Sequence, residues 1–333
     1  MKSIRLSHGG GGEETWKLVR EIFLKYLENP ILSSLEDSAL LRVSSKLSFT
    51  TDGFTVKPLF FRGGDIGKLA VAGTVNDLAV MGAKPLYMSV AFIIEEGFSI
   101  EELKRIVESM ARTAEEAGVL VVAGDTKVVP KGQADGLFIS CSGIGEVLYE
   151  GLSCRNIQEG DGILVTGPLG DHGACILAQR EGFDFGEDFE SDCQPLWDLV
   201  EHLLLTGLRV HAMRDPTRGG LSAVLHEWSH SSGLSFLVKE EAIPIRTQVQ
   251  GLCEFLGLEP YHLASEGRLV LAVHPEDIHK ALERLREHPK GKEARHIGYA
   301  IRPESHPSVI LETPYGTKRF LEPPVGELLP RIC

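Results

Sequence analysis

The stretch GTVNDLAVMGAKP, from Gly73 to Pro85, lies within a long apolar run that begins near Lys68. Its small and branched apolar residues predict a buried helix over 68–81, followed by a strand over 87–94. Asp77 falls inside this helix, where aspartate has poor helix propensity and an unpaired charge is costly to bury. A cation shared with other carboxylates would explain Asp77, which is therefore a candidate metal ligand.

Helix and strand patterns are mixed on both sides of this stretch. Helices are predicted after the Gly9–Gly12 run up to Asn29-Pro30, and over 100–117, 172–180, 195–205, 219–231 and 275–288. Strands are predicted over 39–43, 47–51, 54–59, 119–123, 137–147, 162–166, 235–238 and 268–273. The predicted fold class is therefore α+β, in two α/β halves joined near residues 151–160.

The chain has 333 residues, which is long for a single hydrophobic core and sufficient for two. We expect one domain over 1–150, a second over 151–321 and a tail over 322–333. The tail reads EPPVGELLPRIC, and its prolines favour an extended path of about 3 Å per residue. A long arm stiffened by proline loses little entropy when it docks, and it can carry a thiol between two sites. Cys333 is therefore a candidate carrier of a reactive group. The alternatives are a tail thiol without a task and a docking peptide.

Composition narrows the classes of partner. With 34 basic and 47 acidic residues the formal net charge is −13, which repels nucleic acid and anionic membrane surfaces. The six cysteines are spread along the chain without a CxxC pair, which is typical of reduced thiols in a cytoplasmic protein. No signal-peptide core or membrane-spanning apolar run is present. We expect a cytoplasmic protein that binds neither nucleic acid nor membrane.

Further aspartates stand at turn-like points beside glycine or polar residues, namely Asp37, Asp52, Asp125 and Asp215. Carboxylates at strand ends and helix starts can converge on Mg²⁺ and nucleotide phosphates. The alternative is that they cap helices and shape turns. Glycine clusters at 167–173 and 218–220 precede predicted helices, whose free N–H groups could hold phosphate oxygens.

Two motifs point to other chemistries. The segment Gly63–Leu69, GGDIGKL, lacks the spacing and the hydroxyl residue of a P-loop, so a glycine turn leading into a helix is the better interpretation. The segment His226–His230, HEWSH, matches the HExxH signature on a predicted helix. A third zinc ligand could come from Glu240, Glu241 or Glu254. A zinc peptidase therefore remains an alternative.

Seven segments in order along the chain resemble the HypE family of hydrogenase maturation factors, within the aminoimidazole-ribonucleotide-synthetase-like and selenophosphate-synthetase-like superfamily. They are HGGGG (8–12), EDSA (36–39), GTVNDLAVMGAKP (73–85), AGDTKVV (123–129), GPLGDHGA (167–174), RDPTRGGL (214–221) and PRIC (330–333). The ending PRIC is the part specific to this family. The resemblance implies a homodimer joined through a β-barrel of the N-terminal halves, with an ATP site near that interface.

The resemblance also implies the reaction and the partners. HypF, a carbamoyltransferase, would load a carbamoyl group on Cys333, the chain would dehydrate it to a thiocyanate with ATP, and a HypC–HypD scaffold would receive the cyanide for the iron of nickel–iron hydrogenase. A kinase or ligase of the same superfamily that acts on a free small molecule is the alternative.

Site residues follow from the matching positions. For Mg²⁺ the candidates are Asp52, Asp77, Asp125 and Asp215. For ATP they are His8, Gly9, Gly10, Gly11, Gly12, Asp37, Asn76, Gly124, Thr126, Asp171, Arg218 and Gly219. Lys127 could balance phosphate charge, and either Glu266 or His172 could be the base that removes the nitrogen proton.

Overall fold

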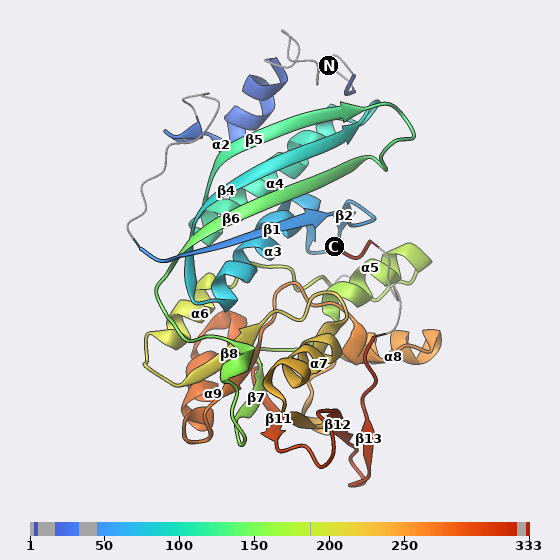
Figure 1. Cartoon of the computed structure of the whole chain (residues 1–333). Helices are drawn as coiled ribbons and strands as arrows, with labels where there is room; N and C mark the ends of the chain where they lie inside the picture. Colours follow the sequence, from blue (N-terminus) through green and yellow to red (C-terminus); the bar gives the residue numbers. More distant parts are fainter. Residues whose placement is uncertain (1–2, 6–16, 33–44, 187, 325–330) are drawn as a thin grey trace.

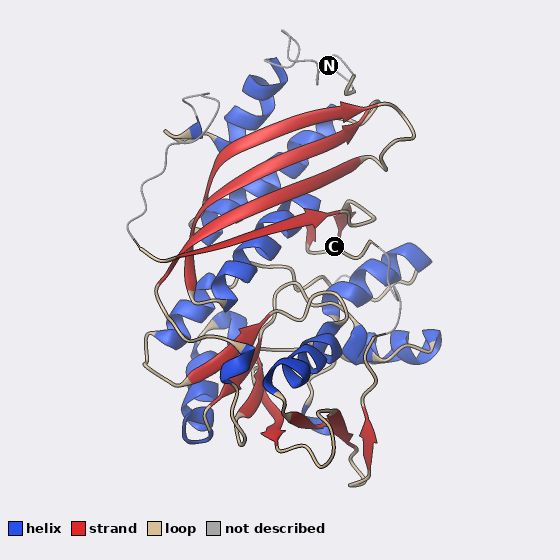
Figure 2. Ribbon diagram, in the orientation of Figure 1, coloured by secondary structure: helices blue, strands red, loops and turns tan. Residues whose placement is uncertain are grey.

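A computed structural model describes residues 3–5, 17–32, 45–186, 188–324 and 331–333. A four-stranded sheet with two long helices forms the first half, and a larger mixed sheet surrounded by helices forms the second (Figure 1). Figure 2 shows that helices and strands are interspersed in both halves. The predicted mixed α/β architecture is confirmed.

The sheet of the first half has the strand order β1-β6-β4-β5. Its strands are β1 (Leu47–Phe54), β4 (Ala83–Glu95), β5 (Leu120–Val129) and β6 (Leu137–Val147). β6 runs antiparallel to both β1 and β4, whereas β4 and β5 are parallel. A small hairpin of β2 (Phe60–Phe61) and β3 (Gly64–Asp65) precedes the first long helix.

Two helices cover one face of this sheet, α3 (Ile66–Val80) and α4 (Ile100–Ala117). α3 is buried almost all round, because it lies between the sheet and two elements of the second half, α6 (Trp197–Leu204) and β8 (Val210–Arg214). The amphipathic α4 begins at Ser99, whose side chain accepts from the Glu102 N–H, and ends at Gly118 with a φ of 68°. α3 therefore carries Asp77 to the junction of the two halves.

The second half is built on a seven-stranded sheet with the order β13-β12-β9-β11-β7-β10-β8, in which only the β12–β9 pair is parallel. Its strands are β7 (Gly162–Val165), β8 (Val210–Arg214), β9 (Ser235–Lys239), β10 (Val270–Val273), β11 (Arg295–Ile301), β12 (Val309–Glu312) and β13 (Lys318–Phe320). Its helices are α5 (Asp171–Glu181), α6 (Trp197–Leu204), α7 (Gly220–Ser232), α8 (Thr247–Leu256) and α9 (Ile278–Glu287). Near the start of the chain, a π-helical segment, Val19–Leu24, leads into α2 (Lys25–Leu27).

One predicted strand is wrong. Of residues 54–59, only Phe54 belongs to a strand, and the following residues pair instead with the last residues of the chain. The predicted strand over 39–43 lies outside the described residues. Among the described residues, no helix combines the length and apolar character that crossing a bilayer requires.

Candidate active site

Three carboxylates meet where β1, α3 and the loop after β8 come together. Asp52 on β1 has Cys141 of β6 as its strand partner, on the sheet face that α3 covers. Asp77 lies one turn of α3 beyond Thr74, which contacts that cysteine, so Asp52 and Asp77 face each other. The Thr50 hydroxyl donates to Asp77 Oδ2 over 2.6 Å.

The Asp77 carboxylate acts on the pKa of its two acidic neighbours. Burial and then the Asp77 carboxylate raise the pKa of Asp52 to about 6. Burial and then Asp77 raise the pKa of Asp215 to about 7. Asp52, Asp77 and Asp215, which we call the carboxylate group, are therefore short of positive charge. A divalent cation would relieve this repulsion, and oxygen ligands of this kind suit Mg²⁺, although in the described part of the chain the three side chains are not arranged as a ready-made ligand set.

Asp125 does not join the carboxylate group within one chain. In the sheet register Asp125 aligns with Ala91, Ser140 and Gly53, whereas Asp52 aligns with Cys141. Successive residues of a strand point to opposite faces, so Asp125 points away from the face of Asp52. β1 and β5 are also opposite edges of the sheet, about 14 Å apart at three strand spacings. Within one chain, Asp125 therefore lies apart from the other three Mg²⁺ candidates.

Lys127 lies on the same outward face of β5 as Asp125, two residues further along. Its Nζ is 2.9 Å from Asp125 Oδ2, and the hydrogen bond from this ammonium lowers the pKa of Asp125. Gly124 and Thr126, two predicted ATP ligands, flank Asp125 on this edge strand. This part of the predicted site is thus separated from the carboxylate group by the width of the sheet.

The last three residues dock against the first half of their own chain. The Thr55 N–H donates to the Cys333 carbonyl over 3.0 Å, and the Lys57 N–H donates to the Arg331 carbonyl over 3.1 Å. Burial and then the Glu266 carboxylate raise the pKa of the Cys333 thiol to about 12, and Asp52 and Asp215 act in the same direction. The Cys333 thiol is therefore within electrostatic range of the carboxylate group. Residues 325–330 of the predicted flexible tail lie outside the described residues.

Glu266 and His172 have different environments. Burial and then Asp215 raise the pKa of Glu266 well above its usual range. Its Oε1 is buried without a hydrogen-bond partner among the described residues. In His172, Nδ1 lies 2.8 Å from Ser191 Oγ and Nε2 lies 2.8 Å from the Ile332 carbonyl oxygen, while burial lowers its pKa to about 4. His172, with both ring nitrogens engaged, contacts the docked tail, whereas Glu266 keeps a buried oxygen without a partner among the described residues and is the better candidate for the base.

Other predicted ATP ligands have structural partners. The Asn76 amide donates to the carbonyls of Gln194 and Glu266, and Asn76 Oδ1 accepts from the Leu196 N–H over 2.8 Å. Asn76 thus fixes two loops of the second half against α3. Asp171 Oδ2 accepts from Arg246 over 2.8 Å at the start of α5.

Arg218 and Gly219 lie close to the carboxylate group. The charge of Arg218 lowers the pKa of Asp52, Glu266 and Cys333, although burial dominates each of these groups. Gly219 has a φ of 80° and precedes α7. The segment His8–Gly12 and Asp37, the remaining ATP candidates, lie outside the described residues.

Sequence reasoning missed the residues that dock the tail. Thr55 and Lys57 act through backbone N–H groups, and Ser191 orients His172. The Arg331 guanidinium donates to the Thr55 carbonyl over 2.7 Å and pairs with Asp135. No motif marks such partners, because backbone groups are the same in every residue.

The HExxH segment is not assembled as a zinc site. His226 Nε2 lies 2.8 Å from the Leu321 carbonyl oxygen, and Glu227 pairs with Arg214 at 2.8 Å. Within the part of the chain that the structure describes, no three His, Cys, Asp or Glu side chains are already arranged as metal ligands. The helix-surface contacts of His226 and Glu227 explain this motif without a metal.

Comparison with known proteins agrees with this architecture. Residues 35–147 match the N-terminal domain, and residues 158–309 the C-terminal domain, of the AIR synthase related proteins. Carbamoyl dehydratase HypE of Azotobacter vinelandii is 46% identical over 99% of this chain and 97% of its own length. A crystal structure of hydrogenase maturation protein HypE in complex with ATP has a TM-score of 0.96, with 44% identity over 99% of both chains. A HypE–HypF complex structure has a TM-score of 0.81, with 48% identity over 92% of this chain and 99% of that chain.

The two domains define the class, that of the AIR synthase related proteins. Within this class, the sequence identity to HypE proteins extends over nearly the whole chain, and it therefore identifies the family. The chain belongs to the HypE family of hydrogenase maturation proteins, the carbamoyl dehydratases.

Proposed function

We propose that this chain dehydrates an S-carbamoyl group on Cys333 to a thiocyanate at the expense of ATP, and so supplies cyanide for the iron of nickel–iron hydrogenase. The observation that carries the proposal is the docked sulfur, whose pKa responds to Glu266, Asp52 and Asp215. The names of the relatives and the ATP complex of one of them support the same reaction.

The reaction needs a better leaving group than oxide. The carbamoyl oxygen attacks the γ-phosphorus of ATP, ADP leaves, and one N–H proton is lost to give an O-phosphorylated imidate. The C–O bond then breaks, phosphate leaves with its electron pair, and loss of the second N–H proton completes the C≡N bond. The sulfur keeps its bond to carbon throughout.

Glu266 is the residue best placed to accept these protons. It is buried, it is the carboxylate that raises the pKa of Cys333 most, and its own raised pKa makes it a stronger base than an ordinary carboxylate. The carboxylate group would hold Mg²⁺, which would neutralise the phosphates of the nucleotide. Asp52, Asp77 and Asp215 are the ligands that this chain offers.

Loading of the carbamoyl group takes place with the tail elsewhere. A thiol with a pKa of about 12 is protonated at neutral pH and is a poor nucleophile while it is docked. We therefore propose that the tail leaves this position to be carbamoylated by HypF, in line with the complex solved for a relative. The HypC–HypD scaffold as cyanide acceptor rests on the family resemblance.

The outward face of the first sheet supports the proposed homodimer. Four large apolar side chains on this face are more than a third exposed, namely Leu47, Phe49, Ile93 and Leu120. A second copy that closes this face into a β-barrel would bury them. Asp125 and Lys127 lie on the same face, so a role for them in phosphate binding requires the second copy.

Intact mass spectrometry tests the proposal. After incubation with the carbamoyltransferase, carbamoyl phosphate and Mg-ATP, we expect a carbamoyl adduct on Cys333 that loses one water only when ATP is present. Cys333→Ser should lose the adduct, whereas Cys154→Ser, at the other partly exposed cysteine, should keep it. An adduct that persists in Cys333→Ser would show that another residue is the carrier and would overturn the proposal, whereas no adduct on the wild type would favour the kinase or ligase alternative.

A further inference from the structure

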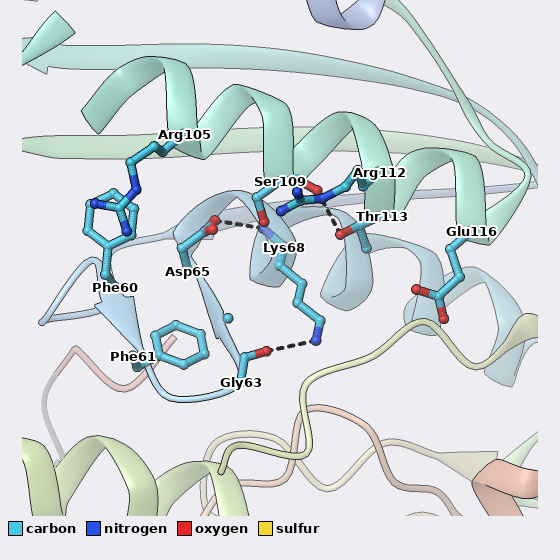
Figure 3. A pocket seen from close by; sticks show the side chains of 11 residues that line it. Phe60, Phe61, Gly63, Asp65, Lys68, Arg105, Ser109, Arg112, Thr113 and Glu116 are labelled. Carbon is cyan, nitrogen blue, oxygen red and sulfur yellow. Dashed lines mark hydrogen bonds between the residues drawn. The ribbon is translucent and has the colours of Figure 1, made fainter. Parts of the chain in front are cut away.

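A separate cavity of about 530 Å³ opens between α4 and the β2–β3 hairpin (Figure 3). It contains no member of the carboxylate group, and neither Glu266 nor Cys333 lines it. Lys68 from the start of α3 and Arg105 and Arg112 from α4 line it (Figure 3). Three cations thus gather in one cavity of a chain whose net charge is −13.

The charges of these cations are poorly neutralised. Lys68 Nζ donates to the Gly63 carbonyl over 2.7 Å, and the Arg105 guanidinium stacks 4.3 Å from the centre of the Phe60 ring. Among the described residues, no carboxylate lies within ion-pair distance of Lys68 or Arg105. Arg112 has an exposed and weak pair with Glu108 at 3.8 Å.

The two acidic residues of the cavity are engaged elsewhere. Asp65 Oδ1 accepts from the N–H groups of Gly67 and Lys68, over 2.7 and 3.1 Å, and so caps α3. Glu116 pairs with Lys290 at 3.0 Å. An incoming anion would therefore meet three side-chain cations and one carboxylate, Asp65, which is held by the helix start and also lies within electrostatic range of Arg112.

We propose that this cavity binds a small anion through phosphate or carboxylate oxygens held by Lys68, Arg105 and Arg112. Guanidinium groups match such oxygens with paired N–H donors, and a lysine adds a compact charge. The volume suits a metabolite-sized ligand. The GGDIGK segment, which fails as a P-loop, thus supplies a lysine to a different anion site.

Isothermal titration calorimetry on the full chain tests this site, with inorganic phosphate and succinate as separate probes at constant ionic strength. Saturating Mg-ATP is present, so that the nucleotide site is occupied. We expect saturable binding of at least one probe, weakened about tenfold or more in Arg105→Gln and in Arg112→Gln. Lys104→Gln removes one charge from the same helix outside the cavity and should bind as the wild type does.

The two probes separate phosphate from carboxylate recognition, and binding of either supports the proposal. Absence of saturable binding by both probes would overturn it, as would equal affinities in Arg105→Gln, Arg112→Gln and Lys104→Gln. Thermal melting checks that each variant is folded. Dehydration of carbamoylated Cys333 is measured in parallel, so failure of this site and failure of the proposed function are distinguishable.

Discussion

His172 Nε2 lies 2.8 Å from the carbonyl oxygen of Ile332, so a buried imidazole holds the residue next to the reactive sulfur. Its Nδ1 accepts from Ser191, which leaves Nε2–H to donate to the tail. The lowered pKa of His172, caused by burial, keeps the ring neutral and this pattern of donors constant at physiological pH.

Removal of this contact should impair docking. In His172→Ala the loss of one buried hydrogen bond, about 1–3 kcal/mol, should lower the docked fraction and slow dehydration by about 5- to 150-fold. Single-turnover mass spectrometry of pre-carbamoylated protein measures the rate, and carbamoylation itself should be unchanged. The exposed His279→Gln is the matched control. An unaltered dehydration rate in His172→Ala would show that the contact does not position the tail.

Asp77 should be needed for the dehydration step and not for carbamoylation of Cys333. Asp77→Asn keeps the shape of the side chain but removes a charge from the carboxylate group, so the carbamoyl adduct should form while water loss slows by about 100-fold or more. The same mass assay reports both steps. Asp184→Asn, at an exposed aspartate, should behave as the wild type does. Continued dehydration in Asp77→Asn would falsify the proposed metal role.

The dehydration rate should rise with pH. Burial, reinforced by neighbouring carboxylates, raises the pKa of Asp52 to about 6 and that of Asp215 to about 7, and it raises the pKa of Glu266 well above its usual range. Below about pH 6 to 7 Asp52 and Asp215 are protonated and bind a cation poorly, and the raised pKa of Glu266 acts in the same direction. Single-turnover rates between pH 5 and 9 should therefore increase and then level off. Glu266→Gln should have a low residual rate. This rate should depend less on pH than the wild-type rate, because Glu266 no longer titrates.

The stability of the folded protein without metal should fall as pH rises, whereas the dehydration rate should increase. The folded-state pKa of Asp215 is raised above its ordinary 3.8, so the unfolded state releases the proton first as pH rises, and stability falls between about pH 4 and 7. Asp215→Asn removes this penalty and should melt a few degrees higher than the wild type at pH 8 without metal. Differential scanning calorimetry with and without Mg²⁺ checks it. A lower melting temperature for the variant would mean that Asp215 stabilises the fold.

The outward sheet face should be a dimer interface. Phe49 is 68% exposed on β1, and Phe49→Asp places a charge in the centre of the proposed barrel, so the variant should be monomeric. Light scattering during gel filtration measures the mass. Tyr315→Asp, at a residue 92% exposed in the turn between β12 and β13, is the control. A dimeric Phe49→Asp would place the interface elsewhere.

The sequence predicted elements best where local signals agree. α4 spans Ile100–Ala117 as predicted, because an amphipathic pattern, a serine cap and a closing glycine coincide. The strand 137–147 is likewise confirmed. α8 was not predicted, although Val249, Leu252 and Cys253 are spaced as on a helix face and Gly257 ends it with a φ of 69°.

The site was harder to predict, because sequence does not show which face of a sheet a residue occupies. Asp52 and Asp125 both looked like members of one metal site, yet strand order and register put their side chains on opposite faces. Docking of 331–333 beside 55–57 is a contact between distant parts of the chain. No local pattern encodes such a contact.

The main-chain oxygens of Arg331, Ile332 and Cys333 each accept a hydrogen bond from the body of the protein. None of these three bonds uses the sulfur. Free thiol, thiocarbamate and thiocyanate forms of Cys333 can therefore bind at the same position one after another. The main-chain contacts stay the same, and only the group on the sulfur changes.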